Sequence, residues 1–166
     1  MAKRAKTTEE TVQNSIADDP HAFRFDLDRA IRDQVVEKLE ASPKLPLSKR
    51  VGPQKSGIYV LYFKNELVYV GKASKETTKS GRTLRARLDE HAGKIGKREN
   101  ISLVGVSCRF LTFESEWWVV AAEFALITLF APAWNYSGFG SKVAGIGRPG
   151  TGRISDWDSR FPPLAT

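Results

Sequence analysis

Residues 57–73 read GIYVLYFKNELVYVGKA, and this stretch decides the fold. It holds two runs of β-branched and aromatic residues, 57–63 and 66–73, separated by Lys64 and Asn65. Such runs joined by a short polar turn are typical of a β-hairpin. Paired strands bring residues that are distant in sequence side by side. The stretch therefore predicts a hairpin in which Tyr59 and Tyr69 face one spot.

Further elements are predicted on both sides of this hairpin. Apolar residues recur every four positions over 26–41, which predicts an amphipathic helix that Pro43 ends. After the hairpin, the pattern predicts a helix over 82–95, a third strand over 102–113 and a long apolar helix over 114–130. Apolar residues alternate along the third strand, so they are expected to share one side of it.

The order strand–strand–helix–strand–helix predicts a small α+β domain, with a three-stranded, mainly antiparallel sheet flanked by helices. In the third strand, Val104, Val106, Cys108 and Phe110 are expected on one face. The chain divides into an N-terminal arm and helix, a central module, and an irregular tail rich in glycine and proline, with boundaries 1–50, 51–136 and 137–166.

Composition restricts the class of protein. The 166 residues carry 26 Lys and Arg against 19 Asp and Glu, a net charge of +7, which favours a nucleic-acid partner. Cys108 is the single cysteine, and with His21 and His91 it provides too few ligands for a structural zinc site. The N-terminus lacks an apolar signal segment, and Glu123 interrupts the longest apolar run, so we expect a cytoplasmic protein.

Two pairs of residues are candidates for chemistry. Tyr59 and Tyr69 are also explained as ordinary strand residues, and a phenol with a pKa near 10 is a poor base unless a neighbour assists it. Arg87 and His91 lie four residues apart, on one helix face. Arginine suits a phosphate, and histidine titrates near neutral pH, which suits proton transfer. A solvated basic face is the alternative explanation for this second pair.

Glu123 stands out within the apolar run WWVVAAEFALITLF of residues 117–130. A buried carboxylate is costly unless it is paired or binds a cation. Mg²⁺ takes one or two carboxylates together with waters and phosphate oxygens. A salt bridge to an arginine remains the alternative. Asn135, which follows this helix, is a candidate for positioning a phosphate or for capping a turn.

Basic residues cluster after the hairpin. Between Lys72 and Arg98 there are nine basic and three acidic side chains, a pattern that suits contact with a phosphate backbone. A solvated surface would show the same pattern. The DNA-contacting candidates, including two from the tail, are Lys72, Lys75, Lys79, Arg82, Arg85, Arg148 and Arg153.

The motifs above resemble the GIY-YIG nuclease superfamily. The tripeptides at 57–59 and 69–71 are similar to the two halves of its signature, with YVG in place of YIG. The family places an arginine on the next helix, a metal-binding glutamate on a later helix and an asparagine beyond it, which Arg87, Glu123 and Asn135 match. The resemblance covers residues 57–136.

Two features resemble one branch of the superfamily. His91, one turn after Arg87, is similar to a histidine of certain restriction enzymes. The tail over 138–158 is similar to that of the type II restriction endonucleases that cut CCGCGG. This implies a type II restriction endonuclease that hydrolyses phosphodiester bonds in double-stranded DNA at a short palindrome.

The resemblance also implies roles for the site residues. Tyr59 would act as general base on the attacking water, and His91 would assist its deprotonation. Glu123 would hold one Mg²⁺, for which Mn²⁺ can substitute, and Arg87 would neutralise charge on the phosphate. The residues that orient the phosphate or its water would be Tyr69 and Asn135.

A palindromic site favours a homodimer, and the first 50 residues could serve dimerisation or embrace DNA. The implied functional partner in the host is a cognate DNA methyltransferase. Two other functions stay open. One is a GIY-YIG nuclease of the repair, structure-specific or homing type. The other is a nucleic-acid-binding module without catalysis, which the set of six candidate catalytic residues argues against.

Overall fold

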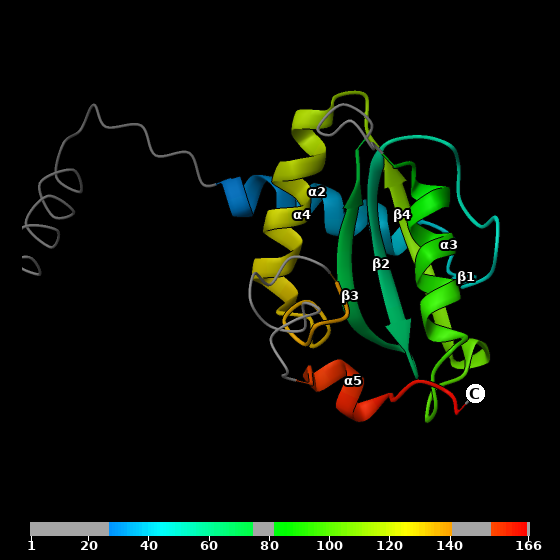
Figure 1. The fold of residues 1–166 in the computed structure, drawn as a ribbon. Helices are drawn as coiled ribbons and strands as arrows, with labels where there is room; N and C mark the ends of the chain where they lie inside the picture. Colours follow the sequence, from blue (N-terminus) through cyan, green and yellow to red (C-terminus); the bar gives the residue numbers. More distant parts are fainter. Residues whose placement is uncertain (1–26, 75–81, 141–153, 166) are drawn as a thin grey trace, which may run out of the picture.

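The computed structural model describes residues 27–74, 82–140 and 154–165. In chain order these residues form helix α2 (Leu27–Ala41), strands β1 (Leu45–Pro46), β2 (Gly57–Phe63) and β3 (Glu66–Ala73), helix α3 (Leu84–Ile95), the 3₁₀ turn η1 (Leu103–Gly105), strand β4 (Val106–Thr112), and helices α4 (Glu116–Phe130) and α5 (Asp156–Arg160) (Figure 1). The hairpin and the three long helices that the sequence predicts are confirmed. None of the described helices is long and apolar enough to cross a membrane.

The strands form one antiparallel sheet in the order β1-β4-β2-β3. Strand β2 is central, and Tyr59 on it pairs with Gly71 of β3 and with Phe110 of β4. The central position explains why its first five residues are all buried. Each strand that carries a motif tyrosine is therefore held by backbone pairing within the sheet.

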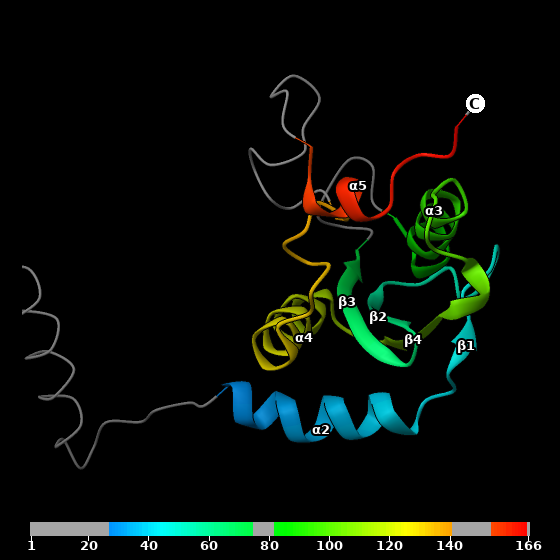
Figure 2. The ribbon, with the colours of Figure 1, turned by 90° about the horizontal axis from the view of Figure 1, so that it is seen from below.

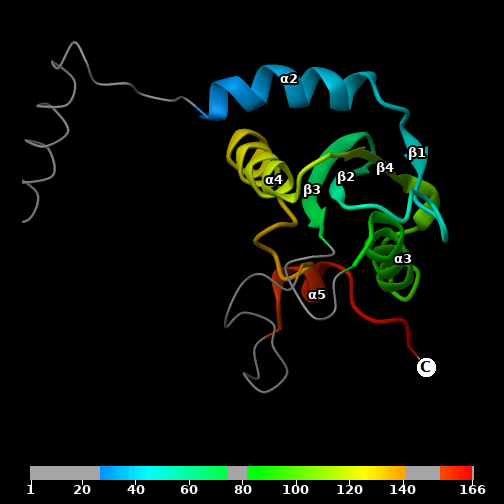
Figure 3. The same cartoon turned by 90° about the horizontal axis from the view of Figure 1, so that it is seen from above.

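Helices cover both faces of the sheet. Helices α2 and α4 pack on one face, against Ile58, Val60 and Val70. Helix α3 and the C-terminal segment pack on the other face, against Tyr59 and Leu61 (Figures 2 and 3). This division follows the two-residue alternation of strand side chains. The motif tyrosines thus belong to the face that α3 covers.

Over the described residues the sheet has four strands, whereas the sequence predicts three. The added strand, β1, is only two residues long and pairs at the edge through Leu45 and Pro46. Proline has no N–H to donate and is confined to sheet edges. For this reason Pro46 does not indicate a strand when only the sequence is considered. The third predicted strand also begins later, because the Ser102 side chain accepts from the Val104 N–H and caps the turn η1. Val104 is consequently 96% exposed.

The C-terminal segment differs from the irregular tail that the sequence predicts. Its described part contains α5, whose N-cap Ser155 accepts from the Asp158 N–H. Trp157 on this helix is fully buried, and Phe161 packs against it with ring centroids 4.4 Å apart. Aromatic burial of this size contributes several kcal/mol to a fold, on the order of 2–3 for each ring. The segment is therefore part of the core that α3 covers.

Candidate active site

The two motif tyrosines meet on the α3-facing side of the sheet. Tyr59 on β2 is completely buried, and Tyr69 on β3 is nearly so. Their ring centroids lie 6.1 Å apart at a tilt of 40°. Because Leu61 pairs with Tyr69, the two tyrosines are offset by one pleat, and their rings lie along neighbouring strands. The prediction that they face one spot is confirmed.

Two glycines of the motif are required by close approach. A Cβ atom on Gly71 would lie 2.5 Å from the Tyr59 hydroxyl oxygen, so only glycine leaves room for the phenol to cross the neighbouring strand. A Cβ atom on Gly57 would lie 2.0 Å from the Leu111 carbonyl oxygen of β4. The glycines therefore admit the packing that aims the Tyr59 hydroxyl, which explains why the motif contains them.

Helix α3 delivers His91 to this hydroxyl. Thr83 caps the helix by accepting from the Ala86 N–H, and a buried stripe of apolar residues fixes its rotation against the sheet. His91 lies within that stripe, 6% exposed, and its Nε2 is 2.7 Å from the Tyr59 hydroxyl oxygen. This is a buried hydrogen bond between the general-base candidate and the histidine proposed to assist it.

Burial determines the protonation state of His91. Desolvation, with further contributions from the positive charges of Arg87 and Lys94, lowers the pKa of His91 to about 3. The imidazole is therefore neutral at pH 7, and its Nε2 can accept the proton of the Tyr59 hydroxyl. The sequence-based expectation that His91 titrates near neutral pH is wrong, because the helix face that carries it is buried.

Tyr59 is a protonated phenol in the resting protein. Burial, followed by the charge of Tyr69, raises the pKa of Tyr59 well above its usual value, and the Arg87 guanidinium counteracts this in part. Burial likewise raises the pKa of Tyr69, where Arg87 opposes the shift and Glu123 adds to it. A raised pKa makes the phenol a weaker acid, and it makes the phenolate left after proton loss a stronger base. The hydrogen bond to His91 places Nε2 where it can receive that proton.

Arg87 lies at the open side of the pair. Its side chain is 23% exposed, and one guanidinium nitrogen is 3.3 Å from a carboxylate oxygen of Glu90. Its charge acts on both Tyr59 and Tyr69. The guanidinium is therefore partly open to solvent while its charge acts on both phenols.

Glu123 approaches the site from α4. It is 4% exposed, and its Oε2 lies 3.0 Å from the ammonium nitrogen of Lys72. Lys72 directly follows Gly71 on β3, so the carboxylate reaches the edge strand beside the motif. The structure thus places Lys72 as one partner of Glu123, where the alternative considered from sequence was a salt bridge to an arginine. A cation already lies against this carboxylate.

The Glu123 carboxylate suits a hard divalent cation whose remaining ligands come from water and substrate. No group of three or more metal-ligating side chains exists within the described ranges. Mg²⁺ is often bound through one or two carboxylates plus waters and phosphate oxygens, so a single buried carboxylate is a suitable protein ligand for it. Glu123 is such a carboxylate, and the ion pair with Lys72 shows that its surroundings accommodate positive charge.

Asn135 is bonded to the backbone of β3. Its Oδ1 accepts from the Val70 N–H at 2.9 Å, and its Nδ2 donates to the Val70 carbonyl at 2.8 Å. The Trp134 N–H also donates to the Val68 carbonyl, at 2.8 Å. These bonds attach the chain after α4 to the free edge of β3. Asn135 therefore fixes the strand that carries Tyr69 relative to the segment after α4.

Three of the seven predicted DNA-contacting residues lie in the described part of the chain, and each of them contacts other groups of the protein. The Arg82 guanidinium pairs with Glu90 and is about half exposed. The Nε of Arg85 donates to the Gly52 carbonyl at 3.0 Å, which fixes the loop before β2, and Lys72 pairs with Glu123 as described. The remaining candidates lie outside the described residues, namely Lys75, Lys79, Arg148 and Arg153.

Sequence reasoning missed the residues that enclose the imidazole. Phe139 stacks on His91 with ring centroids 4.7 Å apart and an interplanar angle of 21°. Lys94, one turn after His91, donates to the Phe139 carbonyl at 2.7 Å. The sequence feature that could have indicated this contact is the GFG of residues 138–140, which places an aromatic residue between two glycines just beyond Asn135.

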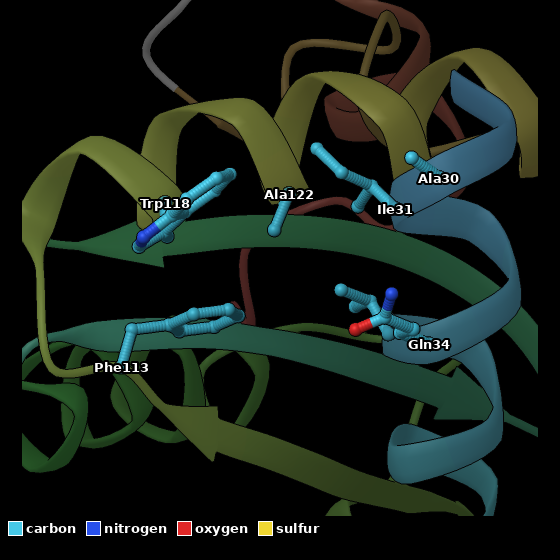
Figure 4. A pocket seen from close by; sticks show the side chains of 7 residues that line it. Ala30, Ile31, Gln34, Phe113, Trp118 and Ala122 are labelled. Carbon is cyan, nitrogen blue, oxygen red and sulfur yellow. The ribbon is translucent and has the colours of Figure 1, made fainter. Parts of the chain in front are cut away.

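A separate pocket of about 450 Å³ lies between α2 and α4, on the other face of the sheet (Figure 4). Its lining is apolar apart from Gln34 and includes Ile31 of α2 and Trp118 of α4. Figure 4 shows Trp118 and Phe113 at the end of the pocket away from Gln34. None of the candidate catalytic side chains lines it. The pocket is therefore distinct from the Tyr59–His91 site.

The chain is similar to a known protein family. The family model described as the Eco29kI GIY-YIG domain matches residues 52–163 of the chain. Among solved structures, a mutant of bacteriophage T4 EndoII matches with 19% sequence identity and a TM-score of 0.36, over 62% of this chain and 97% of the other. No curated protein matches the chain. The family match covers the hairpin, α3, α4 and α5.

Proposed function

Since the chain belongs to the Eco29kI GIY-YIG family of type II restriction endonucleases, we propose that it hydrolyses phosphodiester bonds of double-stranded DNA at a short palindromic site in a Mg²⁺-dependent reaction. The chain is a site-specific DNA endonuclease by its family. The observation that carries the proposed mechanism is the buried hydrogen bond of 2.7 Å between the Tyr59 hydroxyl and His91 Nε2.

Proton transfer is proposed to run from water to His91 through Tyr59. The Tyr59 oxygen accepts a proton from the attacking water while its own proton passes to the neutral Nε2 of His91. The water oxygen bonds to phosphorus, and the bond to the 3′-oxygen breaks. The departing 3′-oxygen takes a proton from solvent water, which leaves 5′-phosphate and 3′-hydroxyl ends. An imidazolium beside Arg87 is costly, so negative charge developing on the phosphate must stabilise it.

Three side chains are proposed to hold the phosphate. Glu123 would hold one Mg²⁺, or Mn²⁺ in its place, after exchange for the Lys72 ammonium that now lies 3.0 Å from Oε2. When bound, this ion supplies Lewis-acid stabilisation of the scissile phosphate and the departing oxygen. Arg87 would neutralise the phosphate charge, and Tyr69 would orient the phosphate or the water. Asn135 would act through Val70, by holding β3 in place.

A digest of phage DNA tests the proposal. Purified protein is incubated with the DNA and Mg²⁺, and the ends of the fragments are sequenced. Discrete fragments that share one palindrome at their ends, with 5′-phosphates, are expected. A smear, or cleavage confined to branched junctions, would instead indicate a nuclease of another GIY-YIG class. Tight, salt-dependent binding without cleavage would indicate a binding module.

The active form is proposed to be a homodimer, because a palindrome presents two equivalent half-sites. Helix α4 offers a surface for the second copy. Trp117, Val120 and Phe124 lie three and four residues apart, which places them on one stripe, and they are exposed by 62%, 42% and 63%. The stripe carries no charge, so it suits another apolar surface better than a DNA backbone.

The exposed area supports this choice of partner. Large aromatic side chains bury roughly 150–250 Å² each, so the stripe and the adjacent Trp118 offer roughly 400 Å². A stable dimer needs about 800 Å² from each partner. The stripe would therefore form the apolar centre of the interface, with polar neighbours around it.

Sedimentation tests the dimer. The wild type should sediment as a dimer at micromolar concentration. Trp117→Glu should sediment as a monomer. An acidic residue in the first turn of α4 is compatible with the helix but not with a buried apolar interface. Val104→Glu, at a position that is 96% exposed on η1, should remain a dimer. A monomeric wild type, or a dimeric Trp117→Glu variant, would refute this interface.

The cellular context follows from the same proposal. A restriction endonuclease acts in the cytoplasm of its host, beside the chromosome. Its functional partner is a cognate DNA methyltransferase that protects the host's own sites. Co-expression provides the test. The wild-type gene should be tolerated only with a methyltransferase of the same specificity, and a Glu123→Gln variant should be tolerated without it.

A further inference from the structure

The segment after Asn135 folds back over the imidazole that contacts Tyr59. Phe139 in this segment is 3% exposed, and its ring stacks on His91 at 4.7 Å with 21° between the planes. The same ring meets Tyr69 edge-on, at 5.0 Å and 79°. One side chain thus contacts both the histidine and the second tyrosine of the site.

Independent contacts hold this ring in place. Lys94 donates to the Phe139 carbonyl at 2.7 Å, and its ammonium nitrogen lies 5.0 Å from the ring centroid. Trp157 of α5 packs on the same ring at 4.4 Å, and Trp134 packs on it at 5.0 Å. The ring is therefore in contact with α3, with α5 and with the segment after α4.

The backbone on both sides of Phe139 is also constrained. Gly138 has φ = +94°, and a Cβ atom there would lie 2.5 Å from the Cβ of Ser155. A Cβ atom on Gly140 would lie 2.6 Å from the Tyr69 hydroxyl oxygen. Both glycines let the chain pass directly over the site. The GFG stretch is thus built to bring one aromatic ring against the imidazole.

We propose that Phe139 is a positioning residue for DNA cleavage. Its ring holds the His91 imidazole in the orientation in which Nε2 is hydrogen-bonded to the Tyr59 hydroxyl. A face-on ring blocks rotation of the imidazole and excludes water from it. Displacement of a catalytic group by about 1 Å can cost on the order of 10²-fold in rate. The inference rests on the proposed roles of Tyr59 and His91, and it makes the C-terminal segment part of the active site.

The same enclosure keeps His91 neutral. The ionisable groups that face the imidazole are Tyr59 on β2, Tyr69 on β3, and Arg87 and Lys94 on α3. From α5, Asp158 acts on Lys94. These charges stay in place when Phe139 is shortened. Any rise in the pKa of His91 in such a variant therefore reports water entering where the ring had been.

Two matched substitutions separate positioning from packing. Phe139→Leu keeps an apolar side chain but removes the flat face against His91. Phe161→Leu removes a ring from the same aromatic group, where Phe161 packs on Trp157 at 4.4 Å and is 8% exposed. Within the described ranges, Phe161 has no ring contact with His91 or Tyr69. Both variants lose comparable packing, which thermal denaturation should show as similar falls in Tm.

The first readout is steady-state cleavage. Phe139→Leu should lower kcat by at least tenfold with KM within threefold of the wild type, and Phe161→Leu should change kcat by less than threefold. The second readout is an NMR titration of the histidine ring protons, assigned with His91→Gln, since the chain has only two histidines. His91 should not titrate between pH 5 and 8 in the wild type or in Phe161→Leu, but should titrate there in Phe139→Leu.

Equal kcat values for the two leucine variants, or a His91 that stays neutral throughout in Phe139→Leu, would overturn the proposal. The NMR readout needs no cleavage. If the wild type cut no DNA, the proposed reaction would fail, while the titration would still decide whether Phe139 controls His91.

Discussion

Replacement of Asn135 by alanine tests whether this residue acts on strand β3 or on the substrate. The substitution removes the bonds of 2.9 and 2.8 Å to the N–H and carbonyl of Val70, a residue that is completely buried. Each bond contributes about 0.5–1.5 kcal/mol net, so the loss should be about 1–3 kcal/mol. For a chain of this length that corresponds to a fall in Tm of roughly 2–12 °C.

Asn135→Asp is the matched control. A carboxylate accepts from the Val70 N–H but cannot donate to the Val70 carbonyl, and it places a negative charge beside that oxygen. At pH 7 this variant should be destabilised at least as much as alanine. Both should cleave DNA within about tenfold of the wild type at 20 °C, where all remain folded, because Asn135 holds the strand and not the phosphate.

Circular dichroism melts and single-turnover cleavage on one oligonucleotide duplex provide the two measurements. An unchanged Tm combined with a loss of cleavage beyond 100-fold would refute the reasoning. That pattern would instead place the carboxamide on the phosphate or its water, the role that the family resemblance suggests.

Three further substitutions probe the site. Glu123→Gln should abolish Mg²⁺-dependent cleavage and leave DNA affinity within threefold by gel shift; cleavage at the wild-type rate would contradict the assignment of the metal ligand. Because the pKa of His91 falls from its usual 6.5 to about 3 on folding, the unfolded state binds the extra proton between these values, so stability should fall as pH drops from 6.5 toward 3. Between pH 6.5 and 4.5 His91 should account for roughly 2–3 kcal/mol of the loss in unfolding free energy, and His91→Gln should lack this part; identical pH dependence in denaturant titrations would argue against a buried neutral imidazole. Gly71→Ala should cost about 1–3 kcal/mol by overpacking the Tyr59 hydroxyl and should reduce cleavage more than Gly93→Ala, where a Cβ atom meets nothing within 4 Å; equal cleavage in the two variants would refute the role of this glycine.

Local periodicity was sufficient to predict the hairpin, the three long helices and the meeting of Tyr59 with Tyr69. These features depend on residues close together in sequence, whose apolar spacing dictates strand or helix. The strand β1 was missed because two residues carry no periodicity. Val104 was misplaced because the Ser102 cap favours a 3₁₀ turn over the extended chain that the alternation of valines suggested.

Contacts between distant segments could not be predicted in this way. The pairing of Lys72 with Glu123 joins β3 to α4, and the bonds of Asn135 to Val70 join residues 65 positions apart. The burial of His91, and with it the lowered pKa, depends on Phe139 and on α5 folding back over the site. Residue type suggested possible chemistry for these groups, but only the packing shows which partner each one has.

Single-turnover cleavage by Tyr59→Phe tests the central claim most directly, since the change removes only the hydroxyl bonded to His91 at 2.7 Å. Loss of a positioned general base should slow cleavage by about 10²–10⁴-fold at saturating Mg²⁺, while the Kd for the duplex, measured in Ca²⁺, stays within threefold of the wild type. Cleavage by Tyr59→Phe within threefold of the wild-type rate would contradict the assignment of Tyr59 as the base.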